Sequence, residues 1–140
     1  MIAKQTTVFI ENRKGRLKEV LNVLKTSGIN ILSLSLADTA EYGLLRIISN
    51  NPAQAKDGLS KAGFSAMLTD VFILEIPHTP GALQDILSVI AEEELNVEYM
   101  YGLSVGGEEA SIVVKTSDLQ KAENVFEKHG IKMLSDKELQ

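Results

Sequence analysis

The stretches GRLKEVLNVLKTSGINI (15–31) and GALQDILSVIAEEELNV (81–97) coincide when the chain is shifted against itself by 66 positions. In both, apolar residues recur at i, i+3, i+4 and i+7, which is the spacing of one buried helix face. A glycine opens each stretch, and an asparagine between two aliphatic residues closes it. Chance would rarely match the glycine and the asparagine as well as the aliphatic residues. The sequence therefore predicts an internal repeat.

Each repeat is predicted to contain six elements in the order β-α-β-β-α-β. The first helices should cover 16–27 and 81–93, and the second should begin at the capping residues Asn51 and Ser117–Asp118 and end near Gly63 and Gly130. The pattern predicts strands at 6–11, 29–37, 44–49 and 64–68, and again at 71–76, 95–105, 110–115 and 131–134. Right-handed crossovers would place both helices on one sheet face. We therefore expect an α+β protein with two ferredoxin-like βαββαβ units, each an antiparallel sheet with helices on one face.

The boundary between the units is expected near Thr69-Asp70, so that the first domain covers 1–69 and the second covers 70–140. The segment 64–76 reads as nearly continuous strand, interrupted only at this dipeptide, without a Gly/Ser-rich linker. We therefore expect the two units to pack as one rigid body. The helix stripes should be buried at Leu17, Val20, Leu21 and Leu24, and at Leu83, Ile86, Leu87 and Ile90.

The second predicted strands of the two repeats differ in phase. In 95–105 the apolar residues alternate from Val97 to Val105, whereas Leu32, Leu34 and Leu36 alternate in the opposite phase. A β-bulge would account for the difference. A different partner on one sheet face would also account for it, and the sequence alone leaves both explanations open.

Composition excludes several classes of protein. The chain has 140 residues, of which 44% are hydrophobic and 24% charged, the mixture of an ordinary globular protein. Cysteine is absent, which excludes disulfides, thiolate metal sites and thiol catalysis. The net charge is −5, with +3 over residues 1–70 and −8 over residues 71–140, which disfavours a nucleic-acid partner. No apolar run approaches the ~20 residues of a membrane span and no secretory signal opens the chain, so we expect a cytoplasmic protein without a membrane partner.

The sequence does not predict an enzymatic or metal site. The two histidines, His78 and His129, lie far apart and have no metal-ligand pattern around them. Neither has an obvious partner for nucleophilic catalysis. Phosphate-binding glycine motifs are absent. We therefore expect no catalytic residue, no metal and no cofactor.

Polar detail recurs in the turn between the first strand and the first helix of each repeat, which reads ENRKGRL (11–17) and PHTPGAL (77–83). Glycine here lets a ligand approach the backbone, and the helix start offers unpaired N–H groups suited to a carboxylate. Asn30 and Asn96, at the entry to the second strands, supply both a donor and an acceptor. Each of these residues alone is more typical of a plain tight turn. Their joint recurrence favours a site for an amino acid, which needs donors for its carboxylate and oxygens for its ammonium.

The pattern Asn-Arg-x-Gly-x-Leu, a helix, and Gly-[Ile/Val]-Asn-Ile resembles the ACT domain, a small regulatory module that binds amino acids in aspartate kinases, phosphoglycerate dehydrogenases and related enzymes. The resemblance covers nearly the whole chain, as in a stand-alone tandem ACT protein. It implies a non-catalytic amino-acid sensor that regulates amino-acid metabolism. The ligand-binding residues that it implies are Asn12, Arg13, Lys14, Gly15, Leu17, Asn30 and Ile31 in the first repeat, and His78, Thr79, Pro80, Gly81, Leu83, Asn96 and Val97 in the second.

Departures from the family pattern make the two turns unequal. Lys14 stands where proline is usual, His78 stands where the first repeat has Asn12, and Glu94 replaces the expected glycine. Pro80 pre-sets the backbone of the second turn, which slightly favours that turn as the site. The basic residues of the first turn give it a positive field that suits an anion instead.

Two further expectations concern partners. The alternative function is a protein-interaction or assembly subunit whose ligand sites are vestigial. Two small units leave sheet edges and apolar strand surface uncovered. We therefore expect a homodimer formed through the edges or the open sheet face, with two-fold symmetry.

Overall fold

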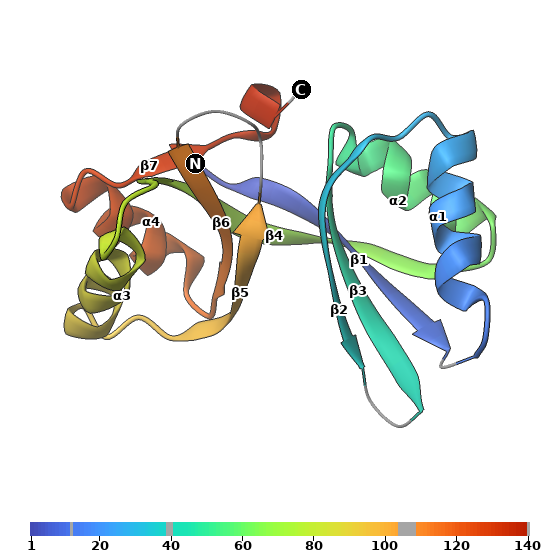
Figure 1. The fold of residues 1–140 in the computed structure, drawn as a ribbon, viewed down its shortest axis with the longest axis horizontal. Helices are drawn as coiled ribbons and strands as arrows, with labels where there is room; N and C mark the ends of the chain where they lie inside the picture. Colours follow the sequence, from blue (N-terminus) through green and yellow to red (C-terminus); the bar gives the residue numbers. More distant parts are fainter. Residues whose placement is uncertain (12, 39–40, 104–108, 140) are drawn as a thin grey trace. The chain divides into compact units, whose positions relative to one another are not determined.

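The computed structural model describes residues 1–11, 13–38, 41–103 and 109–139 and divides into two compact units (Figure 1). Lys4–Thr69 form most of the N-terminal unit, and Asp70–Glu138 form most of the C-terminal unit. Met1–Ala3 belong to the C-terminal unit, where the N-terminal ammonium group pairs with the Glu123 carboxylate. Each unit combines an antiparallel sheet with two helices, which confirms the predicted α+β class with two ferredoxin-like units.

The N-terminal unit follows the predicted element order. Its elements are β1 (Ala3–Glu11), α1 (Arg16–Thr26), β2 (Ile31–Asp38), β3 (Tyr42–Ser49), α2 (Pro52–Lys61) and the first residues of β4 (Ser65–Pro77). The strand order is β2-β3-β1-β4, and β3 runs antiparallel to both β1 and β2. Both helices cover one face of this sheet (Figure 1), and the core between the two layers includes Val8, Val20, Leu24, Leu45 and Ile47.

The C-terminal unit repeats this arrangement. It contains the rest of β4, α3 (Ala82–Glu92), β5 (Val97–Leu103), β6 (Glu109–Thr116), α4 (Leu119–Lys128) and β7 (Lys132–Leu134), followed by a short 3-10 helix (Asp136–Leu139). The strand order is β7-β4-β6-β5, with antiparallel pairing throughout. In its core the ring of Phe72 meets the ring of Phe126 edge-on, with centroids 5.3 Å apart.

The second helix of each unit is capped by a polar side chain, as predicted. The Asn51 side chain accepts a hydrogen bond from the Gln54 N–H at 3.1 Å. In the second repeat the Asp118 side chain accepts one from the Lys121 N–H at 3.0 Å. Because these caps satisfy N–H groups of the first helical turn, they set where α2 and α4 begin.

Strand β4 runs without a break from Ser65 to Pro77, so the predicted interruption at Thr69-Asp70 is wrong. The Thr69 hydroxyl lies 2.7 Å from the hydroxyl of Thr7 on β1. A cross-strand hydroxyl pair satisfies polar side chains within the sheet, so a polar dipeptide here does not end the strand. The sequence around a polar dipeptide does not show whether its side chains find hydrogen-bond partners on a neighbouring strand.

The predicted burial of the helix stripes is confirmed only in part, and less in the second repeat than in the first. On α1, Val20 and Leu24 are buried and Leu17 and Leu21 are half-buried. On α3, Ile90 is buried and Ile86 is half-buried, but the prediction that two leucines are buried is wrong, because 42% of Leu83 and 39% of Leu87 is exposed.

The facing strand explains why this side of α3 is exposed. In the first repeat, Leu36 of β2 and Leu17 of α1 line one cavity. At the position of Leu36 the second repeat has Gly102 on β5, and a Cβ added there would meet nothing within 4 Å. No side chain of β5 therefore covers Leu83 at this point.

The alternating apolar residues of β2 and β5 are out of phase because they lie on opposite faces of their sheets. Both strands have a register shift near their first residues, so a bulge is common to both repeats and does not distinguish them. Leu36 pairs with the core residue Leu45 and faces the helices. Tyr101 pairs with Val113, whose neighbour Val114 is the core residue, so Tyr101 faces the other side of its sheet.

The acidic end of α3 is paired with the end of α4. The Glu93 carboxylate lies 3.1 Å from Lys128 Nζ and 3.0 Å from His129 Nε2. The hydrogen bond with His129, followed by that with Lys128, lowers the pKa of Glu93 below its ordinary value. These contacts offset the unfavourable meeting of negative charge with a helix C-terminus.

Alanine substitutions on α3 test which face of this helix is buried in the core. Ile90→Ala should lower the free energy of unfolding by about 2–5 kcal/mol, because it leaves a cavity in the core. Leu87→Ala should cost clearly less, since 39% of this side chain is exposed. Urea denaturation followed by circular dichroism measures both variants. Equal losses would contradict the assignment of the buried face.

Acid should weaken the contact between α3 and α4. A carboxyl group whose folded-state pKa is lowered stabilises the fold at pH values above its unfolded-state pKa, and this stabilisation is lost as the pH falls through the folded-state pKa. Glu93→Gln should therefore lower Tm at neutral pH, and the difference from wild type should shrink well below the ordinary carboxyl pKa of about 4.3. Glu92→Gln removes the adjacent exposed charge and serves as the control. A Tm difference that does not change with pH would refute this role of Glu93.

Candidate functional site

A cavity of about 110 Å³ opens beside the turn between β1 and α1. Four elements of the N-terminal unit contribute to it: β1, α1, β2 and β3. The lining combines aliphatic and charged residues, namely Ile10, Glu11, Arg13, Arg16, Leu17, Leu36 and Gly43. An apolar wall with a few convergent polar groups is typical of small-molecule sites.

Gly15 forms the turn and leaves the start of α1 uncapped. Its φ of 87° is left-handed, and after it the Arg16 N–H donates to the Arg13 carbonyl at 3.3 Å. Gly15, the N-cap, makes no side-chain cap among the residues that the structure describes, and a free helix N-terminus attracts anions through its N–H groups and dipole. Of the predicted site residues, Arg13 and Leu17 line the cavity, and Lys14 is exposed between Arg13 and Gly15.

Arg16 is held against the core of the N-terminal unit. Its guanidinium carbon lies 4.3 Å from the centroid of the Phe64 ring, and its Nη1 lies 2.6 Å from the Glu19 carboxylate. Only 19% of the side chain is exposed, and among the described residues its buried Nε has no hydrogen-bond acceptor. The guanidinium is therefore fixed in place with unused donor capacity.

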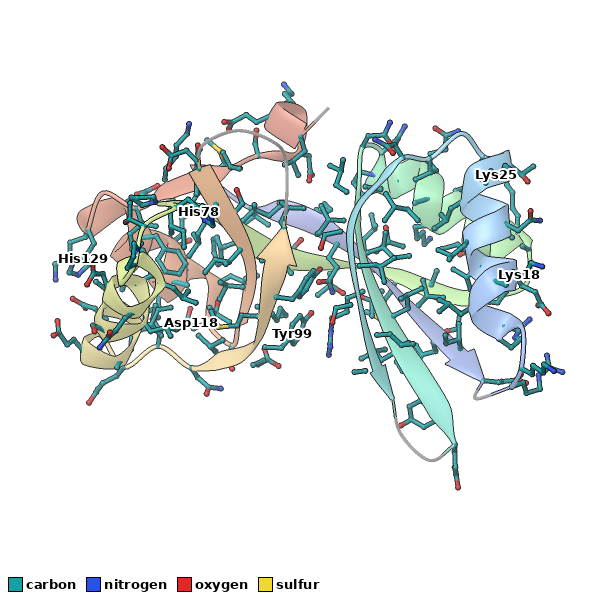
Figure 2. All side chains as sticks on the ribbon, in the orientation of Figure 1. Lys18, Lys25, His78, Tyr99, Asp118 and His129 are labelled. Atoms are coloured by element: carbon teal, nitrogen blue, oxygen red, sulfur yellow. The ribbon has the colours of Figure 1, made fainter. Side chains whose placement is uncertain are left out.

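Glu11 and Arg13 form an exposed ion pair at the same cavity. Arg13 Nε lies 2.9 Å from the Glu11 carboxylate, and more than half of each side chain is exposed. Such a pair contributes little to stability and can exchange partners. On the outer side of α1, Lys18 and Lys25 point away from the sheet (Figure 2), so they add positive charge without lining the cavity.

The turn before α3 keeps the backbone geometry of the first turn. Gly81 has a φ of 86° and precedes α3 without a side-chain cap, and the Ala82 N–H donates to the Thr79 carbonyl at 3.2 Å. The predicted site residues of this turn are all exposed: His78, Thr79, Pro80, Gly81 and Leu83.

The charged groups of the first turn have no counterpart in the second. Ala82 stands at the position of Arg16, and a proline stands at the position of Glu11. The stacking partner Phe64, which follows Gly63 as Ile131 follows Gly130, is matched by that isoleucine. The two turns therefore share a shape but not a chemistry.

Asn30 and Asn96 lie at the far ends of α1 and α3, where they brace the following strands. The Asn30 N–H donates to Asn50 Oδ1 at 3.0 Å, and its carbonyl accepts from the Asn50 N–H at 3.2 Å. Asn96 Nδ2 donates to the Ser117 hydroxyl at 2.7 Å, and its carbonyl accepts from the Ser117 N–H at 3.1 Å. Since α1 has 11 residues and a helix rises 1.5 Å per residue, about 16 Å of helix separates the two ends. One unit alone therefore does not bring its turn and its asparagine together.

The predicted site thus divides into a turn and a brace. Ile31 and Val97 begin β2 and β5 beside the asparagines and belong to the brace. Asn12 lies outside the described residues. Sequence reasoning sought what the repeats share, and it counted Arg16 only toward the positive field of the first turn. It missed other residues of the cavity and its support, which differ between the repeats: Glu11, Leu36, Gly43 and Phe64.

A second hollow, of about 480 Å³, lies over α4 in the C-terminal unit. Its charged groups already serve the fold. Lys121 Nζ donates to the Glu94 carbonyl at 3.3 Å, Lys128 pairs with Glu93, and Asp118 (Figure 2) caps α4. We therefore assign no ligand to this hollow.

Metal-binding clusters and membrane-spanning helices are both missing from residues 1–11, 13–38, 41–103 and 109–139. No three His, Cys, Asp or Glu side chains in these ranges lie where they could hold a metal ion. No helix in the same ranges has the length and hydropathy needed to cross a membrane. His78 and His129 lie in separate places, the turn before α3 and the end of α4 (Figure 2).

Comparison with known proteins relates the chain to a family of regulatory modules. Residues 1–140 match the family described as an ACT domain pair. Protein BT0572 from Bacteroides thetaiotaomicron, known from a crystal structure, is 34% identical over 99% of this chain and 96% of that chain, with a TM-score of 0.92. No curated protein matches the sequence.

The regulatory subunit of aspartate kinase has the same fold. The Thermus thermophilus subunit, in its ligand-free form, is 15% identical over 93% of this chain and 95% of that chain, with a TM-score of 0.65. The Thermus flavus subunit is 17% identical over 91% of each chain, with a TM-score of 0.58. At these identities the likeness concerns the fold alone. The family match over residues 1–140 confirms the resemblance seen in the two turns, and this chain belongs to the ACT domain pair family.

Proposed function

We propose that this ACT domain pair is a non-catalytic sensor that binds an amino acid and regulates amino-acid metabolism. The cavity at the β1–α1 turn carries the proposal, because it surrounds one small space with charged side chains and an apolar wall beside an uncapped helix start. Family membership supports a regulatory role, and so does the fold shared with the aspartate kinase regulatory subunits.

In this proposal the ligand binds at the first turn. Gly15 and Gly81 give both turns the same backbone, but the first turn also has arginine side chains beside a cavity. Pro80 slightly favours the second turn on sequence grounds. In this proposal the arginine side chains beside the cavity count for more and favour the first turn. Arg13, Lys14, Gly15 and Leu17 then frame the ligand, while the backbone of Asn30 and the side chain of Asn96 hold the entry to the following strands.

The alternative function is an assembly subunit with vestigial ligand sites. The second repeat favours this alternative, because its turn before α3 has neither the arginine nor the glutamate of the first turn. The two functions differ in one measurable respect, which is whether any amino acid stabilises the folded protein.

Addition of the right amino acid should raise Tm. A ligand at about 100 times its Kd stabilises the fold by roughly 2.7 kcal/mol, which corresponds to several degrees for a chain of this size. Thermal denaturation with each of the twenty amino acids in turn measures this shift. The amide of the active compound, which lacks a carboxylate, should shift Tm much less. If none of the twenty shifts Tm, the sensor proposal fails and the assembly function stands.

We further propose that the chain forms a homodimer through α3. Leu83 and Leu87 are exposed on this helix. The two outward lysines of α1 are matched on α3 by Gln84 and Ala91, so no lysine stands beside the two exposed leucines as on α1, and the apolar side chains are left open to a partner. Two-fold pairing of one face with itself is the commonest assembly of soluble proteins.

A charge placed on this face should dissociate the dimer. Sedimentation at micromolar concentration should give twice the chain mass for the wild type and a single chain mass for Leu87→Glu. The matched control is Leu34→Glu, a leucine with 44% exposure on β2, and it should remain dimeric. A monomeric wild type would sink the proposal, as would dissociation by Leu34→Glu alone.

A further inference from the structure

We propose that the cavity beside α1 holds a small zwitterionic amino acid, whose carboxylate binds Arg16 and whose ammonium binds Glu11, and that the second repeat has no such site. This inference rests on the proposed function. It adds the size of the ligand, the side chains that recognise its two charges, and a stoichiometry of one ligand per chain.

Arg16 suits the carboxylate because its position is fixed before the ligand arrives. The stack on Phe64 and the contact of Nη1 with Glu19 hold the guanidinium in place. A guanidinium has five N–H donors, so most remain for a ligand. A preorganised and largely buried arginine binds a carboxylate more strongly than a freely moving exposed one, because less side-chain freedom is lost.

Glu11 suits the ammonium because it brings a carboxylate to the same cavity. Among the described residues that line the cavity, Glu11 alone carries a carboxylate. Its exposed ion pair with Arg13 can be exchanged for a ligand ammonium at little cost. An arginine and a glutamate on one cavity recognise both charges of an amino acid, which a plain carboxylate or a plain amine does not carry together.

The small enclosed space beside the turn favours a ligand with a short side chain. Its volume of about 110 Å³ is below the ~150 Å³ of an engineered cavity that holds benzene. Ile10, Leu17 and Leu36 form its apolar wall. A Cβ added at Gly43 would lie 3.2 Å from atoms of both Ile10 and Leu36, so these side chains already pack closely at the back of the cavity. Glycine, alanine and serine are the amino acids of suitable size.

Titration calorimetry on the full chain tests the role of Arg16, with glycine, L-alanine, L-serine, L-leucine and L-phenylalanine as ligands. The wild type should bind one small amino acid per chain. Arg16→Gln should weaken this binding by roughly tenfold or more, as expected for loss of a charge-assisted hydrogen bond. Lys18→Gln removes the same charge from an exposed position on α1 that does not line the cavity, and it should change affinity by less than about threefold. Circular dichroism should show both variants folded.

Two further variants test the ammonium partner and the size limit. Glu11→Gln should weaken L-alanine by roughly tenfold but leave propionate, which lacks the ammonium, unchanged. Leu36→Ala should widen the cavity and increase the affinity for L-leucine relative to L-alanine. Leu36 is 45% exposed, so this variant should keep its fold.

The outcomes separate this inference from the proposed function. Tightest binding of L-leucine or L-phenylalanine by the wild type, two ligands per chain, or equal losses for Arg16→Gln and Lys18→Gln would overturn the inference and leave an amino-acid sensor standing. Should Arg16→Gln not fold, an unchanged affinity of Glu11→Gln for L-alanine overturns it as well. If no amino acid binds the wild type at all, the proposed function itself fails.

Discussion

The left-handed glycine between the first strand and the first helix is the constraint on which each unit depends. Gly15 and Gly81 adopt φ values of 87° and 86°, a conformation that a residue with a Cβ enters only with strain. It lets the chain turn from a strand directly into a helix, so that the apolar stripe of the helix meets the sheet. Because glycine has no side chain, Gly15 and Gly81 give the first helical N–H groups no side-chain cap in the described part of the chain. The core and the candidate site thus depend on one backbone feature.

Features encoded within a few residues could be predicted from the sequence. The periodicity of the helices and the caps at Asn51 and Asp118 depend on neighbours in the chain, and both were found where expected. The exposure of Leu83 depends on Gly102, which lies in a different element, so the helix pattern alone does not reveal it. Continuity of β4 depends likewise on a hydroxyl contact between Thr7 and Thr69 from separate strands.

The candidate site shows the same limit. The turn around Gly15 could be recognised because it recurs at Gly81, but recurrence also suggested that Asn30 belongs to the same site. The length of α1 separates Asn30 from the turn within its unit. Conversely, the stack of Arg16 on Phe64 joins residues far apart in the sequence and has no counterpart in the second repeat. A comparison that looks for shared residues finds the scaffold of a repeated fold, and a comparison that looks for differences finds the chemistry of one copy.

The two repeats also differ in net charge, and this difference affects which of the two turns attracts an anion. Residues 1–70 carry +3 and residues 71–140 carry −8, and salt limits the reach of each charge to about 8 Å, so the charges close to each turn matter most for a carboxylate. The first turn has Arg13, Lys14 and Arg16 in sequence around its glycine, and the second has no lysine or arginine. The second repeat also has Gln84 and Ala91 at the positions of the outward lysines of α1, next to two exposed leucines. The loss of positive charge therefore makes the second turn a poorer anion site than the first, and it leaves the leucines of α3 without neighbouring lysines, so the two copies of one fold differ in the chemistry that they present.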